Sequence, residues 1–290
     1  MRRHTWTSLG MPLVCHIWEP TDALPLATLV FLHGFLDHGL AFTPVAETLS
    51  TRYRVIIPDH RGHGESGRVR EGGYYHFPDY VLDLDALFAS LELNRPILVG
   101  HSMGASIAIY FAGTFTERVS GLLLLDGLGP PHVRDSEGPS RISRWIEAVQ
   151  RLEPGTEPEG DSLKAMAARI GKASPRATPE RLMSLARTAC AQGSDGQWRW
   201  RFDPLHRTPA PTPFDVDRFT AFLTAIRCPS RVIWAEHTPF KGKGCASRLA
   251  SIKGADERIL DGCGHNLHHE NPEALSHEVD AFAQSVLEQP

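Results

Sequence analysis

The chain has 290 residues, of which 41% are hydrophobic and 22% are charged, and this balance excludes a protein that is disordered throughout. Its formal net charge is -4, and no run of Lys and Arg could form a surface for phosphate backbones, which excludes nucleic acid as an expected partner. No continuous apolar stretch reaches the length of about 18 residues that a membrane span requires.

The opening segment, MRRHTWTSLGMPLVCHIWEP, has early arginines but no apolar segment like that of a secretory signal, so we expect a cytoplasmic protein. The cysteines are widely scattered and form no Cys-x-x-Cys pair, which predicts reduced thiols rather than a disulfide or zinc site. They are Cys15, Cys190, Cys228, Cys245 and Cys263.

The first half of the chain alternates apolar runs with segments of helical period. Uninterrupted apolar runs are typical of strands buried on both faces of a parallel sheet. A helical period over 77–93 lies between two of them. We therefore predict an α/β fold with a doubly wound, mostly parallel sheet. The predicted strands here are 27–34, 53–60, 95–102 and 120–127.

The composition changes after Gly127 towards Gly, Pro and acidic residues, and apolar runs return at 228–236 and 255–265. A last amphipathic helix is predicted at 272–289. The sequence thus predicts a core in two parts, 1–127 and 223–290, with a mainly helical cap inserted at 128–222.

A nucleophile is predicted in the motif Gly100-His101-Ser102-Met103-Gly104, which lies directly between the run PILV and a helix-like run of small residues. A sharp strand-to-helix turn strains its central residue, and glycines on either side remove side chains that would collide. Ser102 would project at the start of a helix, whose free N–H groups favour an oxyanion. The alternative is an ordinary tight turn.

Four motifs in order resemble the α/β-hydrolase family: His33-Gly34-Phe35, the run 59–66, the GHSMG motif, and Gly264-His265. The resemblance implies that the backbone N–H groups of Phe35 and Met103 form the oxyanion hole. It also places His33, Gly34 and His101 beside the substrate. The run LLLLDGLGP and residues 198–204 resemble the serine hydrolase-like branch of that family.

His265 is the candidate base because it follows the last predicted strand in a Gly-containing loop, where the family places its histidine. A solvent-facing loop histidine is the alternative, with His268 and His269 close by. A metal site made by these three histidines and Glu270 is disfavoured, because Pro272 soon interrupts the segment and H-E-x-x-H is absent. We expect no metal and no cofactor.

Two carboxylates are candidates for the acid that orients His265. The family pattern Gly-x-x-Asp after the penultimate core strand is missing, because Ala235 and Thr238 stand at those positions. Glu236 is the alternative there. Asp126 is preferred because it ends a buried strand and some family members carry their acid at that point. The alternative interpretation of Asp126 is that it caps a helix or braces a loop.

Residues 198–204 alternate aromatic and charged side chains, so an extended backbone would direct Trp198 and Trp200 to one side. They either line an acyl pocket or attach the cap to the core. The hypothesis from sequence is a carboxylic-ester hydrolase, monomeric or dimeric, with a small-molecule ester substrate. Thioester or carbon–carbon bond hydrolysis, and a non-catalytic binding protein, are alternatives.

Overall fold

The computed structural model describes the chain apart from residues 71, 131–137, 153–158, 243 and 290. One sheet has the strand order β1-β2-β4-β3-β5-β6-β10-β11. Pairing is antiparallel from β1 through β2 to β4 and parallel across the rest of the sheet. The predicted α/β class is therefore confirmed. The strands are β1 (Arg2–Ser8), β2 (Met11–Trp18), β3 (Thr28–Leu32), β4 (Arg54–Pro58), β5 (Ile97–His101), β6 (Gly121–Leu125), β10 (Ser230–Ala235) and β11 (Asp256–Leu260).

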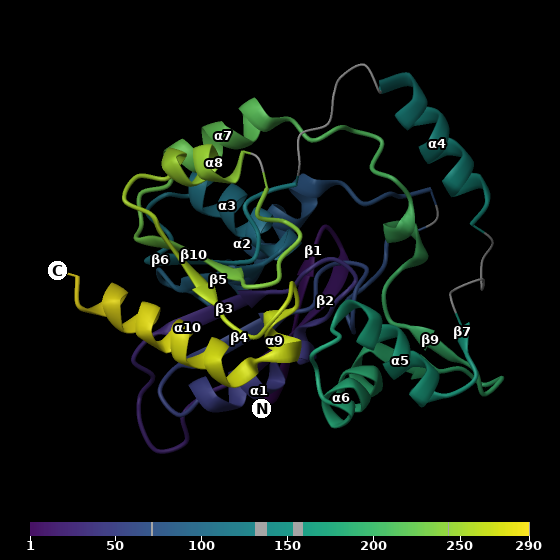
Figure 1. The fold of residues 1–290 in the computed structure, drawn as a ribbon, viewed down its shortest axis with the longest axis horizontal. Coiled ribbons are helices and arrows are strands. Elements are labelled where there is room, and N and C mark those ends of the chain that lie inside the picture. The colour runs from purple at the N-terminus through teal and green to yellow at the C-terminus, as the bar shows by residue number, and fades with distance from the viewer. Residues whose placement is uncertain (71, 131–137, 153–158, 243, 290) are drawn as a thin grey trace.

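Helices cover both faces of this sheet, as Figure 1 shows. One face packs against α2 (Phe77–Ser90), α3 (Met103–Thr114), α7 (Val216–Ala225) and α8 (Cys245–Ser251). The other packs against α1 (Thr43–Leu49), α9 (Leu267–Glu270) and α10 (Pro272–Leu287), with the short 3₁₀ helix η1 (Gly39–Phe42) beside α1. Among the described residues, no helix combines the length and the apolar character needed to cross a bilayer.

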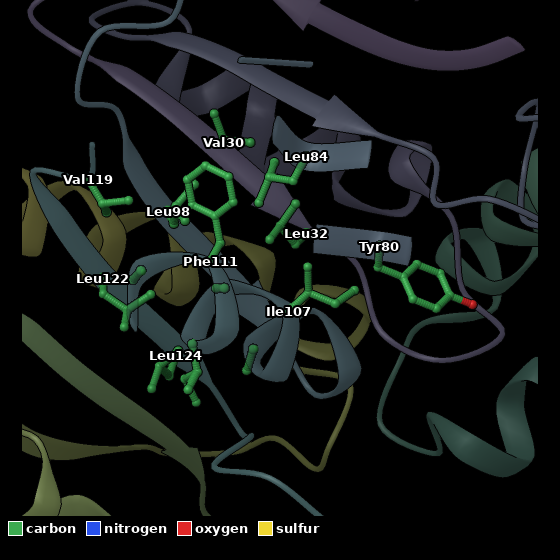
Figure 2. Close-up of a cluster of buried hydrophobic side chains, with 14 of the residues drawn as sticks. Val30, Leu32, Tyr80, Leu84, Leu98, Ile107, Phe111, Val119, Leu122 and Leu124 are labelled. Carbon is green, nitrogen blue, oxygen red and sulfur yellow. The ribbon is translucent and has the colours of Figure 1, made fainter. Parts of the chain in front are cut away.

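The two hydrophobic cores explain why the central strands are apolar without interruption. Along β6, Leu122 and Leu124 join the core on one face, whereas Leu123 and Leu125 join the core on the other. A strand with two buried faces cannot alternate apolar and polar residues, so four leucines in succession fit this position. Figure 2 shows the first of these cores, with β-strand leucines facing Phe111 of α3.

The hairpin of β1 and β2 was not predicted from the sequence. Its turn has Leu9 at φ 47° and Gly10 at φ 76°, a pair of positive values that a tight hairpin turn needs. Leucine is an uncommon residue in such a turn, so the usual hairpin signal is weak. β1 is also an edge strand, in which Trp6 and Ser8 are the buried residues.

The inserted segment combines helices with a small second sheet of order β7-β9-β8. Part of the expected insertion, 131–137 and 153–158, lies outside the described residues. The insertion has a small core of its own, in which Met166, Ala167, Ala186 and Cys190 are buried. Its elements are α4 (Gly138–Gln150), β7 (Glu159–Gly160), α5 (Leu163–Ala173), α6 (Pro179–Ala189), β8 (Cys190–Gln192), β9 (Trp198–Trp200) and the 3₁₀ helix η3 (Pro204–Arg207).

The chain returns to the main core earlier than the expected boundary at residue 222, which falls inside α7. Phe219 and Leu223 of α7 are fully buried in the core that contains α3. The ring of Tyr110 on α3 lies 4.3 Å from that of Phe222, measured between centroids. We infer that α7 belongs to the core and that the insertion ends before it.

Candidate active site

Ser102 occupies the sharp turn between β5 and α3, with φ 53° and ψ -111°. Its N–H donates to the carbonyl of Leu125 at 3.0 Å, which fixes the turn against the end of β6. A Cβ at Gly104 would collide with the carbonyl oxygen of Leu32, and one at Gly100 would lie 2.5 Å from the carbonyl oxygen of Gly104. The strained backbone and the close approach of the neighbouring strand therefore both require the glycines of the motif.

His265 lies between Ser102 and Asp126. Its Nε2 is 3.0 Å from Oγ of Ser102, and its Nδ1 is 2.6 Å from Oδ2 of Asp126. The imidazole is 22% exposed and the carboxylate is fully buried. This arrangement lets a proton on Nδ1 bond to the carboxylate while Nε2 accepts a proton from the hydroxyl.

Asp126 is held by two further donors. The backbone N–H of Ala235 donates to Oδ1 at 3.0 Å, and the hydroxyl of Thr238 donates to Oδ2 at 2.7 Å. The backbone of Asp126 has φ 44°, an unusual value for a residue other than glycine. Because a buried carboxylate without partners is costly, these bonds explain how a charged group is accommodated at this position.

Glu236, the alternative acid, is directed elsewhere. Its Oε2 accepts a hydrogen bond from the N–H of Gly262 at 2.8 Å, and its side chain is 46% exposed. The structure therefore brings Asp126, and not Glu236, to His265. In the sequence, Thr238 was notable only because it stands where the family pattern has an aspartate. In the structure its hydroxyl bonds to Asp126.

The loop after β3 packs against Ser102. A Cβ at Gly34 would lie 3.4 Å from Cβ of Ser102 and 2.7 Å from Nδ1 of His101, so only glycine fits this approach. Phe35 follows directly. Met103 is the first residue of α3, so its N–H has no partner within the helix.

His33 and His101 support the site from inside. The Nδ1–H of His33 bonds to the carbonyl of Gly34 at 2.8 Å, and its Nε2 accepts from the N–H of His60 at 3.0 Å. His101 Nε2 lies 2.8 Å from the carbonyl oxygen of His265. Burial, together with the neighbouring His265, holds the pKa of His101 well below its usual value. Both rings are therefore neutral and brace the backbone.

The run 59–66 braces the same loop. Asp59 accepts from the N–H of Gly39 at 2.6 Å and from that of Glu65 at 2.8 Å. Burial alone would raise the pKa of Asp59, but bonding and charge interactions with His16 hold it below the usual value. These contacts give the run a structural role.

The histidines after His265 do not gather with it around a common point. Within the described part of the chain, the group that could hold a metal is Asp37, His268 and His269, whose ligand atoms lie within 4.8 Å of one another. Oδ2 of Asp37 is 2.7 Å from Nε2 of His268, a hydrogen bond that accounts for the contact without an ion. Glu270 instead accepts from the N–H of Gly264 at 2.6 Å.

A cavity of about 550 Å³ lies beside these loops, between the core and the insertion. Trp200 is part of its lining. Trp198, His33, Gly34 and His101, also expected at the substrate, are not in this lining; both tryptophans pack on the insertion's own core, and the two histidines are buried. The lining is Phe35, Leu36, Asp37, His38, Arg169, Ile170, Ala173, Ser174, Leu185, Ala189, Trp200, Phe202, Arg207, Asn266 and His269.

Comparison with known proteins places this geometry in context. A model described as the alpha/beta hydrolase family matches residues 29–278. The chain is 33% identical over 198 residues to the 3-hydroxybutyrate-oligomer hydrolase of Cupriavidus necator, covering 67% of this chain and 64% of that protein. It is 33% identical over 121 residues to a serine hydrolase-like protein of Danio rerio, covering 41% of this chain and 36% of that one. The matches thus span from about a third to about two thirds of these relatives.

Solved structures give the same fold over nearly the whole chain. A hypothetical protein from Pseudomonas aeruginosa PAO1 has a TM-score of 0.85 at 25% identity, covering 98% of this chain and 99% of that one. A thioesterase domain from the curacin biosynthetic pathway also has a TM-score of 0.85, at 23% identity, covering 97% of this chain and 99% of that domain. At that identity the second likeness concerns the fold alone.

Proposed function

Because the chain belongs to the alpha/beta hydrolase family, we propose that it is a serine hydrolase that cleaves carboxylic esters of small or medium acyl groups. The observation that carries this proposal is the position of the His265 ring, 3.0 Å from Oγ of Ser102 and 2.6 Å from Oδ2 of Asp126. A serine hydroxyl is a weak nucleophile until an adjacent base takes its proton, and this ring is within reach to do so.

In the acylation step, Oγ of Ser102 attacks the carbonyl carbon of the ester while Nε2 of His265 accepts the hydroxyl proton. Asp126 keeps the other ring proton on Nδ1 and stabilises the imidazolium that forms. The tetrahedral oxyanion receives hydrogen bonds from the N–H groups of Phe35 and Met103. Loss of one such donor typically costs about 3 kcal/mol of transition-state stabilisation.

In the second half of the cycle, His265 gives its proton to the leaving alcohol and the acyl group remains on Ser102. Water then attacks the acyl carbon, with His265 acting again as base, and the acid is released. No step draws on a group other than these side chains, the backbone N–H groups and water. Thioesters also present an acyl carbon to the attacking hydroxyl, so they should be tested as substrates beside the esters.

A fluorophosphonate probe and p-nitrophenyl acetate test this proposal. We expect the wild-type protein to be labelled and to release nitrophenol, and Ser102→Ala to lose both activities. Ser247→Ala, which changes an exposed serine on α8, is the matched control and should behave as wild type. A folded wild-type protein that neither reacts with the probe nor cleaves esters or thioesters would instead support a non-catalytic binding protein.

A further inference from the structure

Two arginines of the insertion line the cavity beside the site. Arg169 lies on α5 and Arg207 is the last residue of η3. The guanidinium of Arg207 lies 5.1 Å from the centre of the Phe202 ring, another lining side chain. Among the described residues, no carboxylate forms an ion pair with Arg169 or Arg207, so no acid of this part of the chain neutralises their charges.

The two charges act on each other. Burial, and then the positive charge of Arg169, lower the pKa of Arg207. Both arginines are exposed residues, so water weakens the repulsion between their like charges but does not remove it. An anion bound between the two guanidinium groups would relieve it, and the planar guanidinium pairs well with carboxylate and phosphate.

Asp37 is the one acidic residue in the described lining, and its charge is already engaged. Its carboxylate contacts His268 at 2.7 Å and His38 at 3.3 Å. Burial alone would raise the pKa of Asp37, but the neighbouring histidines hold it well below its usual value. Asp37 therefore does not take the place of an anion at Arg169 and Arg207.

The lining comes from two parts of the chain, the core and the insertion. Phe35 and Asn266 come from the core loops that carry the oxyanion donor and His265, whereas Arg169 and Arg207 come from the insertion. Ile170 and Leu185, which are apolar, line the same space. The Nε1–H of Trp200, also a lining residue, is buried and has no hydrogen-bond partner in the part of the chain that the structure describes.

We propose that Arg169 and Arg207 form an anion subsite, so that the substrate is an ester whose acyl group ends in a carboxylate or phosphate. This inference rests on the proposed function and names its substrate class. The reacting carbonyl would lie at the core loops, the apolar part of the acyl chain would pack on Ile170 and Leu185, and the anionic end would pair with the arginines.

Paired substrates of equal chain length test the subsite by kinetics. We expect mono-p-nitrophenyl glutarate to have a kcat/KM about tenfold higher than p-nitrophenyl valerate, a preference equivalent to one or two charge-assisted hydrogen bonds. The double variant Arg169→Ala/Arg207→Ala should lose this preference, so that the ratio of the two kcat/KM values falls to about one. Added salt should reduce the wild-type preference. Arg187→Ala, at an exposed arginine of α6 outside the lining, is the matched control.

A binding measurement separates this inference from the proposed function. In the Ser102→Ala background, calorimetry with glutarate, propyl phosphate and neutral valeramide should show binding of an anion that depends on Arg169 and Arg207. The tighter of the two anions identifies the group. Equal kcat/KM for both esters, with no loss in the double variant and no anion binding, would overturn the subsite while leaving the esterase intact. Anion binding by a protein that hydrolyses no ester would refute the function and retain the subsite.

Discussion

Thr238 donates a hydrogen bond to Oδ2 of Asp126 at 2.7 Å, the same oxygen that lies 2.6 Å from His265. The hydroxyl therefore helps to fix the carboxylate that orients the imidazole. We predict that Thr238→Val lowers kcat by about tenfold with little change in KM, because one hydrogen bond to a charged group contributes about 1.5 kcal/mol. Thr238→Ser should restore activity. Full activity of the valine variant, with an unchanged pH profile, would show that Thr238 has no such positioning role.

The two candidate acids can be separated by isosteric substitution. Asp126→Asn should lower kcat by about 10⁴-fold, because the amide does not stabilise the imidazolium or hold the required tautomer. Glu236→Gln should leave kcat within a factor of two or so of wild type, since its carboxylate bonds to the loop N–H of Gly262. Steady-state kinetics on one ester substrate measure both. A large loss of kcat in Glu236→Gln, with little loss in Asp126→Asn, would identify Glu236 as the acid.

The nucleophile turn depends on the missing side chain at Gly104. We predict that Gly104→Ala destabilises the fold and removes activity, because its Cβ would collide with the carbonyl of Leu32. Gly138→Ala on α4 is the matched control, since nothing lies within 4 Å of a Cβ there. Thermal unfolding and fluorophosphonate labelling measure the two consequences. Wild-type stability in Gly104→Ala would contradict the close packing of α3 on β3.

Buried histidines predict that stability falls in mild acid. Burial, with smaller effects of neighbouring groups, lowers the pKa of His33, His60 and His268 from 6.5 to about 3. Above pH 6.5 both folded and unfolded states are neutral at these rings, whereas below it only the unfolded state takes up protons. The free energy of unfolding should therefore decrease from pH 6.5 towards 3, by up to about 1.4 kcal/mol per pH unit for each ring.

Urea unfolding between about pH 7 and 4.5 measures this effect, because carboxylates titrate mainly below that window. His268→Gln should reduce the slope, and His277→Gln, at an exposed position of α10, should not. A free energy of unfolding that stays constant over the window would contradict the neutral state of the buried rings.

The positions of the main sheet and of the nucleophile turn could be predicted because their signals are local. Four leucines in succession indicate a strand buried on both faces, and glycines around Ser102 indicate a sharp turn. The hairpin of β1 and β2 was missed because Leu9 replaces the usual turn residues. The expected boundary at 222 falls inside α7, which packs on α3 through side chains, such as Phe219, that are distant in sequence from their partners.

The choice of acid could be ranked but not decided from the sequence. Asp126 and Glu236 follow neighbouring parallel strands, β6 and β10, so both reach the same edge of the sheet. The two differ in the direction of their side chains, since Asp126 bonds to His265 and Glu236 bonds to Gly262. For the pocket, alternation put Trp198 and Trp200 on one side, and of the two the cavity lining includes Trp200. Which tryptophan lines the cavity depends on how the insertion lies over the core.

The position of Asp126 at the end of β6 has a consequence for how such a protein can diversify. Ser102, Asp126 and the loop of Phe35 all precede the insertion, and His265 follows it. Glu236, directly after β10, bonds to Gly262 rather than to His265, so this part of the chain needs only to present the N–H of Ala235 and the hydroxyl of Thr238 to Asp126. Insertions of different length or shape could therefore be exchanged as modules, which would change the compounds admitted while the chemistry of bond cleavage is inherited unaltered.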